Sequence, residues 1–315
     1  MTPLPPEVNQ IDVPLPPLTP QGFFVYCEDN PGYRGRGEKL MSSYGCDEKD
    51  LAHYTCLRTP RRIAVDGRLD TPEWQKAPKS RRFVDLVTGV PGFFETRMAS
   101  LWDDENLYVA FWIEEPNVRA RLTDRDSFVW NENDVEIFIG GEDCYYEFQI
   151  NALGTIYEVF YIWQNAYKRG SRFDVQEFDL LTRRVDILGG FQDGMRHGKH
   201  PRGARWAFMD WDFPGLRAAV QVAGTINDTS NVDKGWTAEI AFPWRGMGVL
   251  AGSRPVPPRD GDVWRMDFSR FELLEYCGGK AEPHPGWALN RHGVYDSHIP
   301  ECFSFVHFSE KSVED

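Results

Sequence analysis

The sequence has no long apolar run. No segment approaches the roughly 20 consecutive apolar residues that a membrane-spanning helix requires, so we expect no membrane partner. The first twenty residues, MTPLPPEVNQIDVPLPPLTP, carry seven prolines but neither the basic start nor the apolar stretch of a signal peptide. A leader already removed would leave the same sequence, so the cellular location stays open at this point.

Positively charged residues are fewer than negatively charged ones. The chain has 315 residues, and 35 Lys and Arg stand against 48 Asp and Glu, which gives a net charge of −13 at pH 7. A nucleic-acid-binding surface needs a positive field that attracts phosphates, so we expect no nucleic-acid partner. A negative balance is compatible with neutral or cationic ligands.

Several motifs that mark common chemistries are missing. There is no GxSxG sequence around a nucleophilic serine and no glycine-rich phosphate-binding loop. None of the six cysteines lies in a CxxC pair, which argues against a zinc ribbon. Cys27, Cys46 and Cys56 are clustered and could include one disulfide, although free buried thiols are an equal alternative. The remaining cysteines are Cys144, Cys277 and Cys302.

Aromatic residues and alternating strands are plentiful instead. The 11 Trp, 12 Tyr and 21 Phe favour sheets over helical bundles. Period-2 patterns separated by Asp-, Asn- and Gly-rich turns predict strands near 82–88, 96–102, 107–114, 134–140, 145–151, 155–163, 219–227, 235–242, 263–270 and 303–308. Helix is expected only at 71–77 and 243–250. The fold class is therefore all-β, an antiparallel β-sandwich resembling a jelly roll with little helix.

The domain organisation follows from where this pattern starts. Residues 1–60 read as a Pro-rich extension that either packs on the body or is flexibly tethered to it. Residues 61–315 read as the sandwich. The interval 170–217 resists a simple strand assignment, and we expect it to decorate one rim.

Alternation places acids and amides together beside one tryptophan. Glu136 faces away from the apolar side of its strand, and the hairpin partner at 145–151 brings Gln149 or Asn151 alongside. A sugar has apolar ring faces and a hydroxyl rim, so an aromatic wall next to such groups suits it. Trp130 precedes this strand, and Trp287 is another loop tryptophan. The alternative is a polar sheet face that is merely solvated.

Seven motifs in order over about 245 residues resemble the family 9 carbohydrate-binding modules. They are AVDGRLDTPEW (64–74), LWDDENLYVAFWIEE (101–115), WNENDVEIFI (130–139), YYEFQINALGTIYE (145–158), GWTAEIAFPW (235–244), GDVWRMDFSR (261–270) and HIPECFSFVHF (298–308). The resemblance implies a β-sandwich that holds a sugar between two tryptophans. It places Trp130 at the first clamp, Trp287 at the second, Glu136 at a hydrogen-bonding carboxylate and Asn151 at a sugar-contacting amide. Two positions depart from the family pattern, since Gln149 replaces an Arg and His284 replaces an Asn.

The expected function is non-catalytic binding of an oligo- or polysaccharide, such as a glucan or a xylan-derived sugar. The candidate ligand-binding residues are Trp130, Glu136, Gln149, Asn151, His284 and Trp287. The resemblance also implies a secreted or periplasmic location and a structural Ca²⁺, for which the loops WDDEN (102–106) and TDRD (123–126) offer oxygens. The oligomeric state is left open.

Two other functions compete with this one. A glycoside-active enzyme on the same fold would use paired carboxylates, and Glu136, Glu147, Glu158 and Glu239 are available. A His-based site for a transition metal or haem would use His284, His292 and His298. His298 lies in the HIPE motif, where a structural hydrogen bond is the simpler role.

Overall fold

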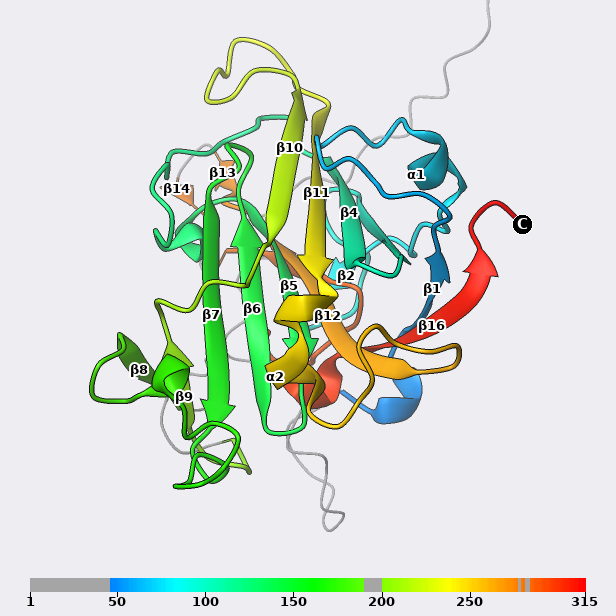
Figure 1. Ribbon diagram of the computed structural model, residues 1–315. Coiled ribbons are helices and arrows are strands. Elements are labelled where there is room, and N and C mark those ends of the chain that lie inside the picture. The colour runs from blue at the N-terminus through cyan, green and yellow to red at the C-terminus, as the bar shows by residue number, and fades with distance from the viewer. Residues whose placement is uncertain (1–45, 190–199, 277–278, 281–283) are drawn as a thin grey trace, which may run out of the picture. The chain divides into compact units, whose positions relative to one another are not determined.

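The computed structural model describes residues 46–189, 200–276, 279–280 and 284–315 (Figure 1). The chain divides into two units, Met1–Lys39 and Leu40–Asp315, and only the second contains described residues. The predictions for residues 1–45, including Cys27, lie outside the described part, as does Cys277. No helix among the described residues is long and apolar enough to cross a membrane.

The described residues form sixteen strands and two short α-helices. Helix α1 (Pro72–Lys76) lies in the predicted interval 71–77, and α2 (Gly248–Ala251) overlaps the end of the predicted interval 243–250. Pro72 starts α1 because its fixed φ suits the first helical turn. The strands are β1 (His53–Arg58), β2 (Val84–Asp85), β3 (Thr96–Trp102), β4 (Asn106–Glu114), β5 (Asp134–Gly140), β6 (Cys144–Ile150), β7 (Ile156–Trp163), β8 (Val185–Leu188), β9 (Arg205–Phe208), β10 (Arg217–Ala223), β11 (Gly235–Pro243), β12 (Val263–Phe271), β13 (Glu275–Tyr276), β14 (Gly279–Lys280), β15 (Gly286–Ala288) and β16 (Ser304–Ser312).

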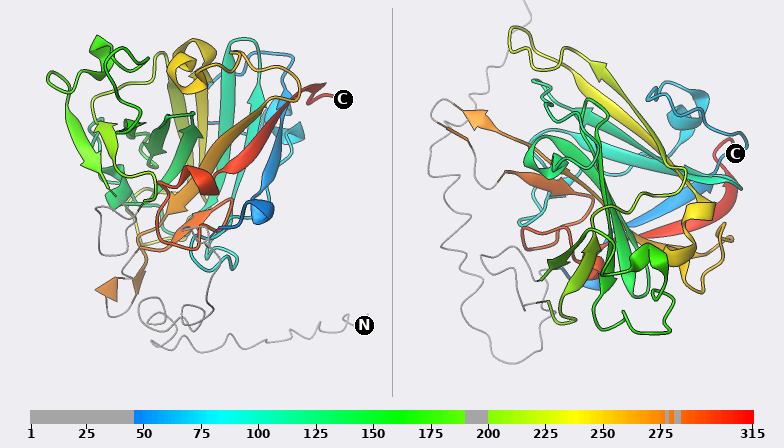
Figure 2. Two further views of the ribbon diagram at one scale, coloured as in Figure 1. Left: turned by 90° about the horizontal axis from the view of Figure 1, so that it is seen from below. Right: turned by 60° about the vertical axis from the view of Figure 1, so that its left-hand side comes forward.

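Fourteen of these strands form one hydrogen-bonded sheet that folds over on itself. Its order is β10-β11-β4-β3-β1-β16-β12-β5-β6-β7-β9-β8, with β15 and β2 joined to the side of β12, and β13–β14 is a separate hairpin. Aromatic rings of the two halves meet in the core: Phe148 of β6 lies 5.7 Å from Phe242 of β11, and Phe111 of β4 lies 6.3 Å from Phe268 of β12. The all-β sandwich class is confirmed (Figures 1 and 2).

Strand β1 gives the sheet its parallel pairs. It lies between β3 and β16 and is parallel to both, whereas the other pairs of the large sheet are antiparallel. Residues 53–58 belong to the segment predicted as an extension, so the sheet reaches back into that segment. The sheet is consequently mixed where the sequence predicts a purely antiparallel one, because β1 and β16 enter it in the same direction.

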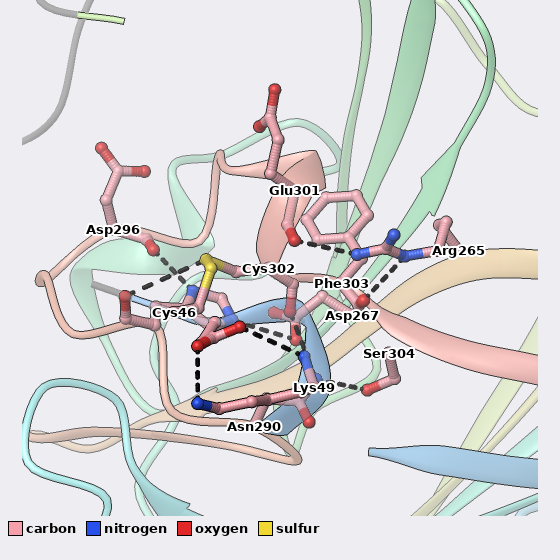
Figure 3. Close-up of a disulfide and its surroundings, with 12 residues drawn as sticks. Cys46, Lys49, Arg265, Asp267, Asn290, Asp296, Glu301, Cys302, Phe303 and Ser304 are labelled. Carbon is pink, nitrogen blue, oxygen red and sulfur yellow. Dashed lines mark hydrogen bonds and ion pairs between the residues drawn. A yellow bond between two sulfur atoms is a disulfide. The ribbon is translucent and has the colours of Figure 1, made fainter. Parts of the chain in front are cut away.

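A disulfide fastens the start of the described chain to the segment before β16. Cys46 pairs with Cys302, and their Cα atoms are 5.8 Å apart although 256 positions separate them in sequence. Figure 3 shows this bond beside Asn290 and Asp296. Cys56 and Cys144 are free and buried. Cys46 therefore has a partner outside the predicted cluster, because the fold, and not sequence proximity, brings the two sulfurs together.

Strands β5, β6 and β7 are covered on both faces. Val135, Ile137 and Ile139 point into the main core, as the alternation predicts. The opposite face carries Asp134, Glu136 and Phe138, which are also buried. Tyr145 of β6 and Tyr161 of β7 continue that second face, and Phe303 packs against it at Phe138. The alternative of a merely solvated polar face is wrong, because loops and edge strands lie over it.

The interval 170–217 supplies part of that cover. Strand β9 continues the sheet from β7, and β8 pairs with β9 at the edge. The expected decoration of a rim thus takes the form of two added strands. Residues 190–199, between them, lie outside the described part.

Candidate functional site

A cavity of about 870 Å³ lies over the polar face of β5, β6 and β7. The cavity is bounded by β8, by the turn around Trp130 and by the loop Tyr295–His298. This volume is in the range of small-molecule sites. Four of the six predicted ligand-binding residues line it, namely Trp130, Glu136, Gln149 and His284.

The floor of the cavity is a bridged pair of carboxylates. Register places Glu136 of β5 directly opposite Gln149 of β6, as the hairpin prediction requires. The Gln149 Nε2 group donates to Glu136 Oε1 and to Glu147 Oε1, at 2.8 Å each. Glu147 precedes Gln149 by two positions and therefore shares its strand face. The exposed fractions of these three side chains are between 1% and 3%, so the floor is almost fully desolvated.

A hydroxyl group donates a hydrogen bond to the second oxygen of each carboxylate. Ser269 Oγ donates to Glu136 Oε2 at 2.8 Å, and Tyr161 OH donates to Glu147 Oε2 at 2.6 Å. His298 Nε2 lies 3.9 Å from Glu147 Oε1. Burial raises the pKa of Glu136 well above its ordinary value, and the nearby Glu147 charge raises it further. Burial also raises the pKa of Glu147 to about 7, because the charged form loses its hydration.

The amide oxygen of Gln149 has no hydrogen-bond donor among the described residues. Since both carboxylates need a donor, the Nε2 side of the amide faces them and the orientation of the group is fixed. The Oε1 atom is buried and accepts no hydrogen bond from the described residues. A buried acceptor without a donor is costly, so this atom is available to a ligand donor.

An exposed aromatic pair forms the wall beside this floor. Trp130 is 40% exposed and Phe128 is 44% exposed, and their ring centroids are 5.5 Å apart. Both line the cavity. The short 3₁₀ turn Val129–Asn131 causes this arrangement, because Val129 is buried under it and its two neighbours are turned outward. The predicted role of Trp130 as a stacking surface fits this placement.

Asn151 lies below the site, not in it. Its Nδ2 group donates to Leu122 O at 2.9 Å and to Glu132 Oε1 at 2.6 Å. Its Oδ1 atom accepts from the backbone N–H groups of Leu153 and Thr155. The Oδ1 contacts hold the turn between β6 and β7, the Nδ2 contacts join that turn to the segment before β5, and Asn151 is fully buried. Because its amide is used in this turn, Asn151 does not line the cavity.

Trp287 also lies away from the cavity. It sits on β15 between β12 and β2, in register with Arg270 and Asp85, and is 2% exposed. Its ring is 6.2 Å from that of Phe94, and the Arg270 guanidinium lies 5.1 Å from the ring centroid. Of the two predicted clamp residues, only Trp130 lines the described cavity, and the two-tryptophan clamp is not confirmed. The pairing of β15 with β12 and β2 buries Trp287 in the core.

Several cavity residues were missed from the sequence. Tyr157 and Tyr161 of β7 share the face of Glu147 and Gln149, and period-2 alternation within 155–163 could have indicated them. Arg184, Tyr295, Asp296 and Ser297 come from loops or from a strand edge. Their side chains reach the cavity through tertiary folding, and no local pattern marks them.

The other carboxylates proposed for catalysis have structural roles. Glu158 accepts from Tyr146 OH at 2.6 Å and from the Phe213 N–H at 2.9 Å, and it pairs with Arg125. Glu239 accepts from Trp74 Nε1 at 2.7 Å and from two backbone N–H groups. Neither lines the cavity, so Glu136 and Glu147 are the two that remain together.

The three histidines of the proposed metal triad do not converge. His292 is fully buried, and its ring nitrogens face Asp296 O at 2.8 Å and Asp267 Oδ1 at 3.3 Å. His284 and His298 line the cavity, and Tyr145 OH lies 3.1 Å from His298 Nδ1. In the part of the chain that the structure describes, no three His, Cys, Asp or Glu side chains are grouped to hold a metal ion.

The WDDEN loop uses its first acid as a turn cap. Asp103 accepts from the N–H groups of Glu105 and Asn106 and from Tyr108 OH. Donors that already surround this carboxylate do not match a calcium site, which needs free oxygens. Calcium binding elsewhere in the chain stays a prediction.

Comparison with known proteins supports part of the sequence resemblance. Residues 65–170 match the family model described as carbohydrate family 9 binding domain-like, and the resemblance is confirmed over that range. This range includes β5, β6, β7 and Trp130. No curated protein matches the chain significantly.

Solved structures with a similar arrangement share little sequence with this chain. One is a candidate carbohydrate-binding protein from Bacteroides uniformis, with a TM-score of 0.49 and 16% identity over 82% of this chain and 100% of that one. Another is a family 9 carbohydrate-binding module from Caldicellulosiruptor kristjanssonii with cellotriose, with a TM-score of 0.45 and 11% identity over 82% and 95% of the chains. Its glucose complex has a TM-score of 0.44 and 11% identity, over 82% and 97%.

Proposed function

We propose that this protein binds a saccharide in the cavity over β5, β6 and β7, without catalysing a reaction on it. The observation that carries the proposal is the exposed Trp130–Phe128 wall beside a desolvated polar floor. A sugar ring can stack its CH face on the indole while its hydroxyls meet the floor. The family match over residues 65–170 supports the same function.

The polar groups of the floor suit hydroxyl recognition. Glu136, Glu147 and the Gln149 Oε1 atom supply acceptors, and the hydroxyls of Tyr157 and Tyr295 lie in residues of the cavity lining. Stacking and a few hydrogen bonds support millimolar to micromolar affinity, which is about 4 to 8 kcal/mol. The sugar itself is open, and an oligo- or polysaccharide end would fit a cavity of this size.

A non-catalytic role is favoured by the position of Gln149. A glycoside hydrolase places the bond to be broken between its two carboxylates. Here one amide nitrogen, at 2.8 Å from each, occupies the space between Glu136 and Glu147. A glycosidic bond cannot enter that space without displacing the amide.

Calorimetric titration of the whole chain with glucose, cellotriose and xylo-oligosaccharides tests the proposal. We expect one or more of them to bind, and Trp130→Ala to weaken that binding about tenfold or more through loss of the stacking surface. Phe93→Ala is the matched control, because Phe93 is a 56% exposed aromatic outside the cavity. Absence of binding heat for every sugar, or an unchanged constant in Trp130→Ala, would contradict the proposal.

The disulfide bears on the cellular compartment of the protein. Disulfides persist in oxidising environments such as the periplasm or the extracellular space. The Cys46–Cys302 bond supports a secreted or periplasmic location for this protein.

A further inference from the structure

The floor of the cavity holds two acids and no strong cation to balance them. Among the described residues, no Lys or Arg forms an ion pair with Glu136 or Glu147, although Arg184 lines the same cavity, and His298 Nε2 lies 3.9 Å from Glu147 Oε1. The Gln149 amide bridges the acids but brings no charge. Buried carboxylates that lack a counter-charge are unstable in the ionised form.

The acceptors of the floor also outnumber the donors that reach them. Glu136 accepts from Gln149 and Ser269, with Ser297 also beside it, and Glu147 accepts from Gln149 and Tyr161. Two carboxylates offer about eight lone pairs, so acceptor capacity is left over. Gln149 Oε1 is buried and accepts from no described residue. A sugar hydroxyl supplies a single donor, whereas an ammonium group supplies three donors, no acceptor and a positive charge. The ammonium group therefore matches both the charge and the number of open acceptors.

We propose that the preferred saccharide carries a protonated amine that docks on Glu136, Glu147 and Gln149, an inference that rests on the proposed function. Trp130 stacks on the sugar ring and the floor receives the amine. The site thus discriminates an amino sugar from its neutral and its N-acetylated forms, because acetylation removes the charge and adds an acceptor.

Proton release accompanies this binding. The pKa of both acids is raised, so a fraction of them is protonated near neutral pH and must ionise when the ammonium group binds. The charged and titratable groups that face the pair are Asp134 of β5, Asp267 of β12, Tyr161 of β7, Asp296 and His298 of the loop, and Arg184 beside Tyr157. Three of these six groups are carboxylates, which add negative charge around the pair, and two are basic.

Calorimetric titration of the full chain with glucosamine, glucose and N-acetylglucosamine near neutral pH tests this inference. We expect glucosamine to bind at least about tenfold tighter than the other two, which is about 1.4 kcal/mol. The amine of glucosamine also titrates near neutral pH and can take up a proton that a carboxyl group releases, so the affinities decide the test. Equal affinities would overturn the inference.

Substitutions of the two floor carboxylates test whether they receive the amine. Glu147→Gln and Glu136→Gln keep the shape of the side chain, and we expect each to remove most of the preference for glucosamine. Glu142→Gln is the matched control, because it makes the same change at the exposed turn of the same hairpin. Thermal denaturation checks that each variant is folded. A preference that survives both floor variants would place the amine elsewhere and overturn the inference.

A methylammonium titration separates the two proposals. If glucose and glucosamine bind alike, the saccharide function stands and the amine inference fails. If no sugar binds but methylammonium binds and depends on Glu147, the charge argument stands and the saccharide function fails. If none of the probes binds, both fail.

Discussion

At the scale of single residues, one amide determines what the cavity floor offers. Gln149 directs its Nε2 group to two carboxylates and therefore presents Oε1 as an acceptor without a donor. Alternation along β5 and β6 predicts the pairing of Glu136 with Gln149, because register follows from the hairpin. Alternation could not predict that Glu147, on the same strand as Gln149, shares that amide, because this depends on side-chain rotamers.

Glu147 should make stability depend on pH. Its pKa is raised from 4.5 to about 7 by burial, so the folded state holds a proton that the unfolded chain has lost. The stabilisation that Glu147 contributes is then complete below about pH 4.5 and decreases as the pH rises toward 7. The loss from this group is on the order of 3 kcal/mol.

Denaturant titrations across this pH window check that expectation. The Glu147→Gln variant should lose less stability than the wild type as the pH rises, because it has no proton to release. The exposed Glu142→Gln variant should follow the wild type. Parallel curves for all three proteins would show that Glu147 does not hold the extra proton.

At the scale of elements, strand pairing separates two tryptophans that look alike in the sequence. Trp130 and Trp287 both lie in polar, turn-rich stretches, and the resemblance assigns both to a clamp. Strand β15 pairs with β12 and β2 and buries Trp287, whereas a 3₁₀ turn presents Trp130 to the cavity. A three-residue strand such as β15 has no periodicity long enough to be read.

Replacement of the two tryptophans should therefore lower the stability by different amounts. Trp287→Ala removes a buried side chain together with its ring contacts to Phe94 and Arg270, so we expect a loss of about 3–5 kcal/mol of stability. Trp130→Ala removes an exposed ring and should cost less than about 1 kcal/mol. Urea denaturation measures both. Loss of sugar affinity in Trp287→Ala with unchanged stability would restore the two-tryptophan clamp.

Long hairpin strands were predictable, and edge or isolated strands were not. The bounds expected for β3 and β5 match the structure, and those for β4, β6, β7, β11 and β12 agree within one residue at each end. Strands β1, β8, β9, β13, β14 and β15 were not predicted. Strands β8 and β9 have four residues each and take their register from the edge of β7. For such strands the partner, not the local sequence, sets the conformation.

At the scale of the whole molecule, the Cys46–Cys302 bond closes a loop of almost the entire described chain. Such a bond restricts the unfolded state more than a short one does. We expect reduction to lower stability by about 2–5 kcal/mol, measured as denaturation with and without a thiol reductant. The Cys46→Ser/Cys302→Ser double variant should start at the lower stability and show no response to the reductant. An equal response in wild type and double variant would assign the effect to other cysteines.

The disulfide also bears on the cavity wall. Asn290 donates to Cys302 O at 3.2 Å and to Ser304 Oγ at 2.7 Å, and the Tyr295–His298 loop lies between these positions in the chain. Figure 3 shows Asn290 and Asp296 on either side of the bond. The sequence indicated the separate parts of this region as a HIPE motif and a histidine-rich segment. The bond joins this region to Cys46, which lies 256 positions before Cys302 in the chain.

The place of β1 has a consequence for synthesis on the ribosome. This strand is among the first described elements to emerge, yet one of its two neighbours is β16, the last strand. Its contacts with β3 cover only two residue pairs, whereas those with β16 extend along the whole strand. Strand β1 must therefore wait, with an open edge, until β16 has been translated, and the sheet closes only after that strand has been made.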